Sequence, residues 1–370
     1  MEHRVKQIRI VQVGLGLIGS TVVEQIVEQQ HEWHERLGLD IRISAILTTQ
    51  FALVAGPDGF APEVLPEVVS RRRAGADLAE IAAALDLKSV TSIDFDLNRL
   101  GLGRPIVLDA AAGAATTELA EQALAVDGGV VYSNKAPLSQ AIPDSSVLWD
   151  GARNGSVRYE TTCGAGLPVI STIASLLNTG DKVTEIVGCL SGTLGAIFSD
   201  IAAGQPLSTA IKTAKDAGYT EPDPRDDPSG LDVARKALIL ARTIGRTDDL
   251  TDISVESLVP DSLSDCSVER FMEQIADHNA PVAARQHEAA NSASTLKYVA
   301  TVPAIGPIKV GIEPVSTSTV LGALQGPENI VSIRTTRYDR FPLTISGPGA
   351  GAAVTAAGMI ADMLELARAG

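Results

Sequence analysis

The feature that most constrains the fold is a glycine turn between a predicted strand and a predicted helix near the N-terminus. Residues 8–13 are rich in β-branched side chains, and Gly14-Leu15-Gly16-Leu17-Ile18-Gly19 leads into apolar positions at helical spacing. Glycines at these positions allow a tight turn, close approach of a pyrophosphate and close helix packing, and the helix N-terminus favours phosphate. We therefore predict dinucleotide contacts at Gly14, Gly16, Leu17, Ile18 and Gly19. A glycine turn that binds nothing is the alternative.

Further strands and helices alternate after this turn. The pattern predicts strands at residues 41–47, 105–111 and 129–133 and a helix at residues 116–126. Such alternation is typical of an α/β protein with a Rossmann-type doubly wound parallel sheet. A chain of 370 residues also suits two domains. We assign residues 1–150 to the dinucleotide-binding domain.

The end of the second predicted strand bears on the choice between NAD and NADP. NAD-binding folds commonly place an acid there to bond the ribose hydroxyls. This chain has Leu47-Thr48-Thr49-Gln50 instead, with no carboxylate to repel a 2′-phosphate and no arginine directly after it. Thr48 is a candidate cofactor contact, and the preference between the two cofactors stays open, with NADP slightly favoured.

Two further strand ends carry polar or glycine-rich segments. Lys135, in Ser133-Asn134-Lys135, follows the fourth strand, where a nicotinamide and an anionic substrate would meet; a solvated surface lysine is the alternative. We expect a strand over residues 157–162 that contains Glu160, followed by Cys163-Gly164-Ala165-Gly166-Leu167-Pro168 and a helix. One carboxylate with inward carbonyls suits a monovalent cation, and a plain turn explains the same residues equally well.

Two more segments carry candidate substrate contacts. Ser191-Gly192-Thr193 places two hydroxyls at a helix start, for capping or for substrate. The stretch at residues 218–230 holds four acids and three prolines and runs into a helix with Asp232 and Lys236 on one face. The acids could hold an ammonium group while the lysine handles a proton. The alternative is a proline-rich turn before an ordinary ion pair.

These motifs, in this order, resemble homoserine dehydrogenase, and the resemblance extends to the glycine loop and Ala-rich helix at residues 346–358. It implies interconversion of L-aspartate 4-semialdehyde and L-homoserine with NAD(P)H. Carried over to matching positions, Lys236 is the proton donor and Lys135 lies between substrate and cofactor. The other implied contacts are substrate at Glu221, Asp232, Asp227 and Thr193; cofactor at Ala111, Gly218 and Gly351; and sodium at the Glu160 side chain and the backbone of Cys163, Ala165 and Leu167.

Two segments depart from the family pattern. Residues 109–113 read Asp-Ala-Ala-Ala-Gly where the family commonly has a hydroxyl, so cofactor contacts at Ala111 must come from backbone. Residues 316–322 lack an expected histidine-proline pair. Two rival functions therefore stay open: a related oxidoreductase acting on another amino or hydroxy aldehyde, and a cofactor-binding relative without turnover.

Composition excludes other classes of partner. The net charge of −15 argues against nucleic acid, whose binding needs basic patches. No apolar run is long enough to span a bilayer and the N-terminus does not resemble a signal peptide, so we expect a cytoplasmic protein. Residues 151–340 form the predicted α/β substrate-binding domain, with strands at 294–301, 308–315 and 329–337, and residues 341–370 return to the first domain. The resemblance implies a homodimer built on this second sheet, and we expect a monofunctional chain without a kinase or regulatory domain.

Overall fold

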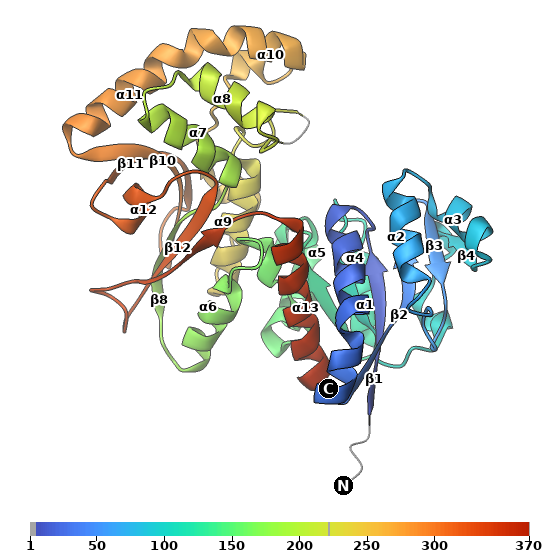
Figure 1. Ribbon diagram of the computed structural model, residues 1–370. Coiled ribbons are helices and arrows are strands. Elements are labelled where there is room, and N and C mark those ends of the chain that lie inside the picture. The colour runs from blue at the N-terminus through green and yellow to red at the C-terminus, as the bar shows by residue number, and fades with distance from the viewer. Residues whose placement is uncertain (1–4, 221–222, 370) are drawn as a thin grey trace. The chain divides into compact units, whose positions relative to one another are not determined.

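The computed structural model describes residues 5–220 and 223–369 and divides into two compact units (Figure 1). The first unit runs to Gly166 and resumes at Gly351; the second spans Leu167–Ala350. These boundaries differ from the expected ones at 150 and 340. Residues 151–166 complete helix α5 and add strand β7 to the first sheet, whereas residues 341–350 contain strand β13 of the second sheet.

The first unit contains a seven-stranded sheet in the order β4-β3-β2-β1-β5-β6-β7. Strands β2, β1, β5, β6 and β7 run parallel, which confirms the predicted parallel sheet. The sequence did not predict β3 and β4, which extend one edge as antiparallel strands. The bounds are β1 Lys6–Val13, β2 Leu39–Leu47, β3 Phe51–Val54, β4 Ser89–Thr91, β5 Ile106–Asp109, β6 Gly129–Tyr132 and β7 Val157–Arg158.

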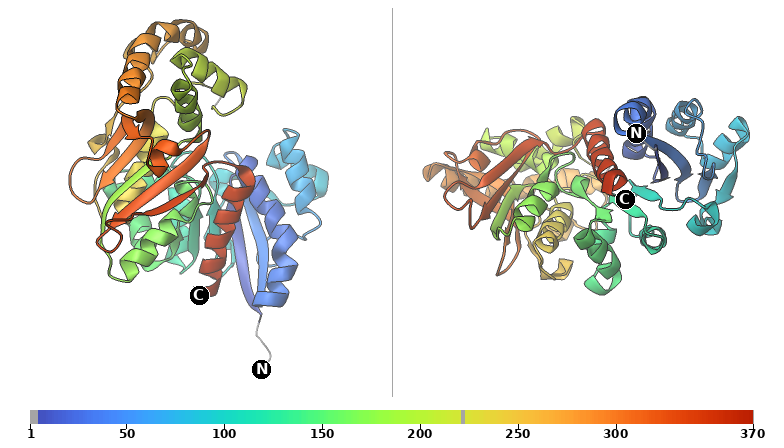
Figure 2. Two further views of the ribbon diagram at one scale, coloured as in Figure 1. Left: turned by 60° about the vertical axis from the view of Figure 1, so that its left-hand side comes forward. Right: turned by 90° about the horizontal axis from the view of Figure 1, so that it is seen from below.

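Helices lie on both faces of this sheet (Figure 2). Helix α13, from the far end of the chain, packs beside α1 and on β5 and β6. Its apolar residues Ala356, Met359, Ile360 and Met363 belong to the same buried core as β1 and β2. The bounds are α1 Leu17–Leu37, α2 Leu65–Arg73, α3 Leu78–Leu85, α4 Thr117–Ala125, α5 Ile142–Asn154 and α13 Ala352–Ala369.

The second unit contains a six-stranded sheet in the order β13-β12-β8-β10-β11-β9. Its strands pair antiparallel, except that β9 runs parallel to β11. Residues 346–348, which the sequence pattern predicts to begin a glycine loop, instead end strand β13, which pairs with β12. The bounds are β8 Val183–Cys189, β9 Ser254–Val255, β10 Ser294–Pro303, β11 Lys309–Ser316, β12 Glu328–Thr335 and β13 Leu343–Pro348.

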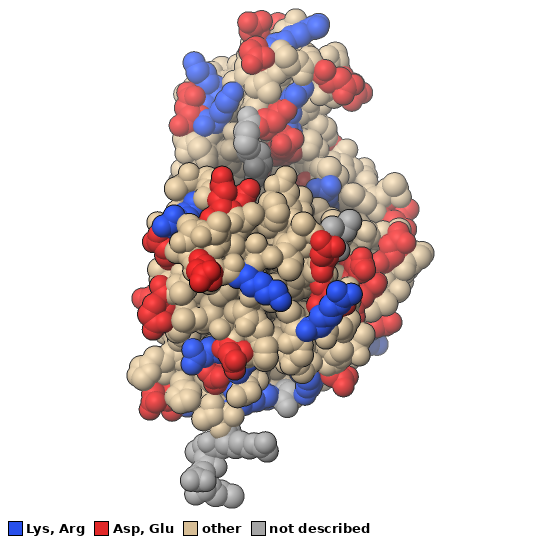
Figure 3. Space-filling view, turned by 90° about the vertical axis from the view of Figure 1, so that its right-hand side faces the viewer, with Lys and Arg blue, Asp and Glu red and all other residues tan. Residues whose placement is uncertain are grey.

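Helices α7, α9 and α11 of the second unit each pack on β10. The bounds are α6 Val169–Asn178, α7 Gly192–Ala202, α8 Leu207–Asp216, α9 Leu231–Thr243, α10 Val268–Gln274, α11 Asn279–Asn291 and α12 Val320–Ala323. In the described part of the chain, none of the helices is both long and apolar enough to cross a membrane. On the face in Figure 3, basic side chains are interspersed with acidic ones.

Candidate active site

The glycine turn follows the carboxyl end of β1 and opens α1. Gly14 has φ +82°, and a Cβ there would lie 2.8 Å from the backbone of Ala110, so only glycine fits. A Cβ on Gly19 would lie 1.9 Å from the carbonyl oxygen of Gly14. Gly16 has open space on its Cβ side and caps α1 without any side-chain acceptor. The helix therefore offers backbone N–H groups at an uncrowded turn, which suits a phosphate.

Thr48, at the end of β2, lies in a tight turn toward β3. Its hydroxyl donates to the Phe51 carbonyl at 3.1 Å, and its own carbonyl accepts from Ser92 at 2.8 Å. No carboxylate occupies this strand end. The nearest basic run in the sequence ends α2, and two of its members are already paired: Arg71 with Glu67 at 2.8 Å, and Arg73 with Glu24 at 2.6 Å.

The loops after β5 and β6 carry Ala111 and Lys135. The backbone N–H of Ala111 donates to the Asp109 carboxylate at 2.9 Å, so this N–H is already occupied. The contact expected from the Ala111 backbone is thus limited to its carbonyl oxygen. Lys135 lies half-buried in a turn whose backbone accepts from Ser139 at 3.1 Å. The first unit therefore brings the glycine turn, Ala111 and Lys135 to the carboxyl ends of β1, β5 and β6.

The second unit holds Lys236 in a defined position. Lys236 lies in the second turn of α9 with 9% of its surface exposed. Its Nζ lies 2.8 Å from Oδ2 of Asp232 and donates to the Leu190 carbonyl, just after β8, at 2.7 Å. The ion pair is thus combined with a buried backbone contact, which an ordinary surface pair lacks. The ammonium is oriented by two acceptors.

The remaining substrate candidates surround the loop before α9. The Thr193 hydroxyl donates to the Tyr219 carbonyl at 2.5 Å, so it tethers that loop to α7. Ser191 caps α7 through the Leu194 N–H, which confirms the capping alternative for this hydroxyl. Gly218 has φ +73°, and the Asp227 carbonyl accepts from the Gly230 N–H at 3.1 Å. Glu221 lies outside the described residues.

The segment with Glu160 differs from the expected strand. Strand β7 ends at Arg158, and Glu160 instead begins a 3₁₀ turn over Glu160–Thr162. The reason is that the Glu160 N–H donates to Asp362 on α13 at 2.9 Å, and not to a neighbouring strand. Glu160 is 7% exposed. Among the described residues, no three His, Cys, Asp or Glu side chains cluster as a metal site, so a cation here would need carbonyl ligands.

The backbone after Glu160 turns sharply. Gly164 has φ +92° and Ala165 has φ +53°, which is uncommon for a residue with a Cβ. Cys163 and Ala165 are both buried. Leu167 belongs to the second unit. A turn of this kind redirects successive carbonyl groups, as a monovalent-cation site requires.

One face of α13 packs against this turn. A Cβ on Gly166 would lie 2.3 Å from the Val354 carbonyl oxygen, and one on Gly358 would lie 2.5 Å from Cγ2 of Thr161. Val354, Gly358 and Asp362 recur every four residues, so they share one helix face. Burial raises the pKa of Asp362 to about 7. Gly351, with φ +136°, precedes this helix.

The segment that lacks the expected histidine-proline pair forms a short capped helix. The Thr319 hydroxyl accepts from the Gly322 N–H at 3.1 Å, and a Cβ on Gly322 would lie 2.1 Å from the Ser316 carbonyl oxygen.

The sequence analysis did not identify Asp109 and Asp362 as hydrogen-bond partners of the site segments. A buried acid as the last residue of a hydrophobic strand was a usable signal for Asp109, whereas nothing local marks Asp362.

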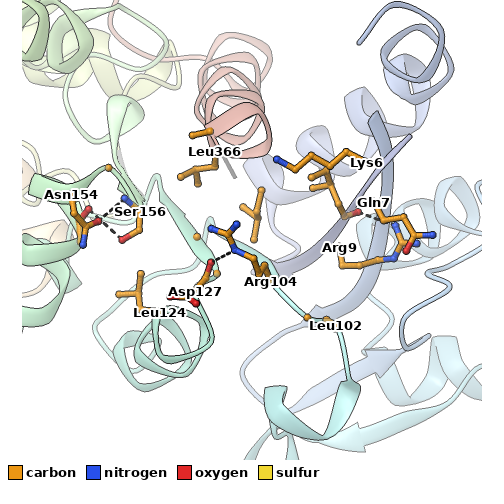
Figure 4. Close-up of a pocket in the computed structure, with 18 of the residues that line it drawn as sticks. Lys6, Gln7, Arg9, Leu102, Arg104, Leu124, Asp127, Asn154, Ser156 and Leu366 are labelled. Atoms are coloured by element: carbon orange, nitrogen blue, oxygen red, sulfur yellow. Dashed lines mark hydrogen bonds between the residues drawn. The ribbon is translucent and has the colours of Figure 1, made fainter. Parts of the chain in front are cut away.

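A cavity of about 860 Å³ lies at the other end of the first sheet (Figure 4). Lys6 begins β1 and Gly129 begins β6, so both mark the amino ends of the strands. Arg104 donates to the Asp127 carbonyl at 2.8 Å along its wall. Since the glycine turn follows the carboxyl end of β1, this cavity is not the candidate cofactor site.

Both units of the chain are similar to known families and proteins. The family described as "Homoserine dehydrogenase" matches residues 168–364, and "Homoserine dehydrogenase, NAD binding domain" matches residues 14–159. The homoserine dehydrogenase of Saccharomyces cerevisiae is 31% identical over 376 residues, which cover 98% of this chain and 99% of the yeast protein. A hyperthermophilic archaeal homoserine dehydrogenase in complex with NADPH shares the fold with a TM-score of 0.73 at 21% identity, covering 98% of each chain.

A longer relative shows the same similarity over part of its length. The bifunctional aspartokinase/homoserine dehydrogenase 2 of Arabidopsis thaliana, a chloroplastic protein, is 36% identical over 359 residues, covering 96% of this chain. The chain spans 38% of the length of that plant protein. The two family matches cover both units, and the yeast relative matches end to end. The chain therefore belongs to the homoserine dehydrogenase family of NAD(P)-dependent oxidoreductases.

Proposed function

We propose that this chain interconverts L-aspartate 4-semialdehyde and L-homoserine, with Lys236 as the proton donor to the aldehyde oxygen. The observation that carries the proposal is the buried ammonium of Lys236, oriented by Asp232 and the Leu190 carbonyl. Family membership supports the reaction class. A charged donor with a defined direction is what carbonyl reduction needs at the oxygen atom.

The residues of the glycine turn fit a dinucleotide. Gly16 is open, no side chain caps α1, and no acid lies in the first turn of that helix. A bound NAD(P)H would supply the hydride that reduces the carbonyl carbon. Absence of an acid at Thr48 permits the phosphate of NADP, and a related structure contains NADPH. We propose that both cofactors bind and that NADPH is preferred.

The residues of this chain then bind the substrate, stabilise the charged groups and donate the proton. As hydride reaches the carbonyl carbon, the oxygen becomes an alkoxide, and the Lys236 ammonium donates a proton to it. Asp232 stabilises the positive charge of Lys236 before transfer. Asp227, Thr193 and Glu221 are proposed to bind the polar end of the substrate. Lys135 is proposed to contact both substrate and cofactor.

The turn after Glu160 is the proposed cation site. The carboxylate of Glu160 and the carbonyl oxygens of Cys163, Ala165 and Leu167 would be the ligands for sodium, because hard cations prefer oxygen. The positive φ angles at Gly164 and Ala165 support this assignment. Titrating the protein with sodium chloride against choline chloride while following its melting temperature tests it.

One assay decides the main proposal. The purified protein is given aspartate semialdehyde with NADPH or NADH, and oxidation is followed by absorbance, with homoserine and oxidised cofactor as the reverse reaction. We expect turnover in both directions. Cofactor binding without turnover would favour the non-catalytic relative, and faster turnover of a different amino or hydroxy aldehyde would favour the other oxidoreductase.

The homodimer and the cytoplasmic location stay predictions. Light scattering, which measures the mass of the particle in solution, tests the homodimer.

A further inference from the structure

A buried carboxylate at the end of β5 has no part in the proposed reaction. Asp109 is 1% exposed, and its carboxylate accepts from the Ala111 N–H at 2.9 Å, the Thr116 hydroxyl at 2.5 Å and the Asn134 amide at 3.3 Å. Burial raises the pKa of Asp109, although all three donors oppose that shift. Burying a carboxylate costs folding free energy unless its hydrogen bonds compensate for the lost solvation.

Asn134 extends this network to the lysine loop. Its amide nitrogen also donates to the Gly113 carbonyl at 2.7 Å, and its amide oxygen accepts from the Ala136 N–H at 3.1 Å. Lys135 lies in the sequence between Asn134 and Ala136, which this second hydrogen bond joins. The backbone carbonyl of Asp109 accepts from Ser133 at 2.9 Å as well. The loop that presents Lys135 is thus fixed to β5 through one amide and one carboxylate.

The same carboxylate fixes the wall beside the glycine turn. The Ala110 N–H donates to the Val13 carbonyl at 2.9 Å, and a Cβ on Gly14 would lie 2.8 Å from the Ala111 nitrogen. The backbone of Ala110 and Ala111 therefore lies directly against the turn proposed to hold the pyrophosphate, so a displacement of Ala111 would change the wall of that turn.

We propose that Asp109, with Asn134, is a positioning residue that sets the glycine turn and Lys135 in register for the cofactor. This proposal rests on the cofactor role of that turn. In this role the buried carboxylate of Asp109 acts through the Ala111 N–H and the Asn134 amide, which it holds in place. Each of its three donors comes from a different segment, namely the β5 loop, the start of α4 and the β6 loop.

The test separates positioning from stability. Asp109→Asn turns one acceptor into a donor that faces the Thr116 hydroxyl and the Asn134 amide, and Thr116→Val removes one hydroxyl at nearly constant volume. The matched control is Thr335→Val in the second unit, where a buried Thr335 hydroxyl donates to Asp181 at 2.7 Å. NADPH affinity by fluorescence titration, KM and kcat, and melting temperature are measured for all four proteins, including the parent.

We expect all three variants to melt earlier than the parent, and only Asp109→Asn and Thr116→Val to bind NADPH more weakly, on the order of ten-fold for Asp109→Asn. As the affinity of these two variants for NADPH falls, their KM for the cofactor should rise. Parental NADPH affinity in folded Asp109→Asn, or an equal loss of affinity in Thr335→Val, would overturn the positioning role. A parent that binds no dinucleotide would instead overturn the proposed cofactor site and this inference together.

Discussion

Lys236 Nζ lies 2.8 Å from Oδ2 of Asp232, one helical turn earlier on α9, and 2.7 Å from the carbonyl oxygen of Leu190. The side chain of Lys236 is 11% exposed and that of Asp232 is 40% exposed. The ammonium is therefore shielded from solvent, whereas the carboxylate is in contact with it. An exposed i,i+4 pair contributes little to stability. This pair instead fixes the direction of an ammonium.

Replacing Lys236 with alanine should therefore remove the proposed proton donor. We expect turnover to fall by a factor on the order of one hundred or more, with NADPH affinity retained. Lys212→Ala, which removes an exposed lysine of α8, is the control and should keep parental turnover. Steady-state kinetics and a fluorescence titration measure both. Turnover of Lys236→Ala within a few-fold of the parent would take the proton-donor role away from this residue.

Asp232→Asn should act on both substrate binding and the lysine. The amide keeps the shape of the side chain but loses its charge, which weakens a charge-assisted hydrogen bond. We expect a higher KM for homoserine, a lower kcat and an unchanged affinity for NADPH. Glu221→Gln, in the acidic stretch that precedes α9, should also raise the KM for homoserine. If both variants kept parental kinetics, the proposed substrate pocket would be wrong.

Thr48→Asp tests the adenine end of the cofactor. Since no acid repels the 2′-phosphate, the parent should use both cofactors and prefer NADPH. Introducing a carboxylate at residue 48 should shift the preference toward NADH. Salt should weaken the NADPH preference only slightly, because Arg71 and Arg73 already pair with Glu67 and Glu24. Comparing kcat/KM for both cofactors at two salt concentrations is the measurement; a parent strictly specific for NADH would contradict this reasoning.

Local pattern predicted the elements whose residues carry their own signal. The glycine turn and the pair of Asp232 and Lys236 depend on spacing within one segment, so they could be found directly in the sequence. The turn at Glu160 could not, because its N–H bonds to Asp362, about two hundred residues later. β13 was hidden for another reason: Gly347 and Pro348 disfavour a strand, and only pairing with β12 makes one. A distant partner thus hid the Glu160 turn, whereas β3 and β13 were missed although each pairs with a strand close to it in sequence.

Lys297 gives a pH-dependent prediction. It is 4% exposed and donates to the Leu324 carbonyl, and burial lowers the pKa of its ammonium from 10.5. The unfolded chain therefore binds more protons between the lowered pKa and 10.5, so this residue makes the free energy of unfolding rise with pH in that window. Lys297→Met should lack that rise. Urea unfolding of both proteins between pH 7 and pH 10 tests it; parallel curves would show that the charge carries no penalty.

The contact between Gly358 and Thr161 predicts a rescue. Alanine in a helix interior normally gains about 1 kcal/mol over glycine. A Cβ on Gly358 would, however, lie 2.5 Å from Cγ2 of Thr161 and 3.1 Å from Cα of Gly166. Overpacking of this kind costs about 1–3 kcal/mol, so we expect Gly358→Ala to destabilise the protein.

Thr161→Ser removes the methyl group and keeps the hydroxyl that donates to the Tyr132 carbonyl at 3.3 Å. In the double variant the new Cβ has the space that the methyl group occupied, so most of the stability should return. Chemical unfolding of the parent, both single variants and the double variant measures the coupling between the two residues. A double variant that loses the sum of the two single effects would show that α13 does not hold the Glu160 turn through this contact.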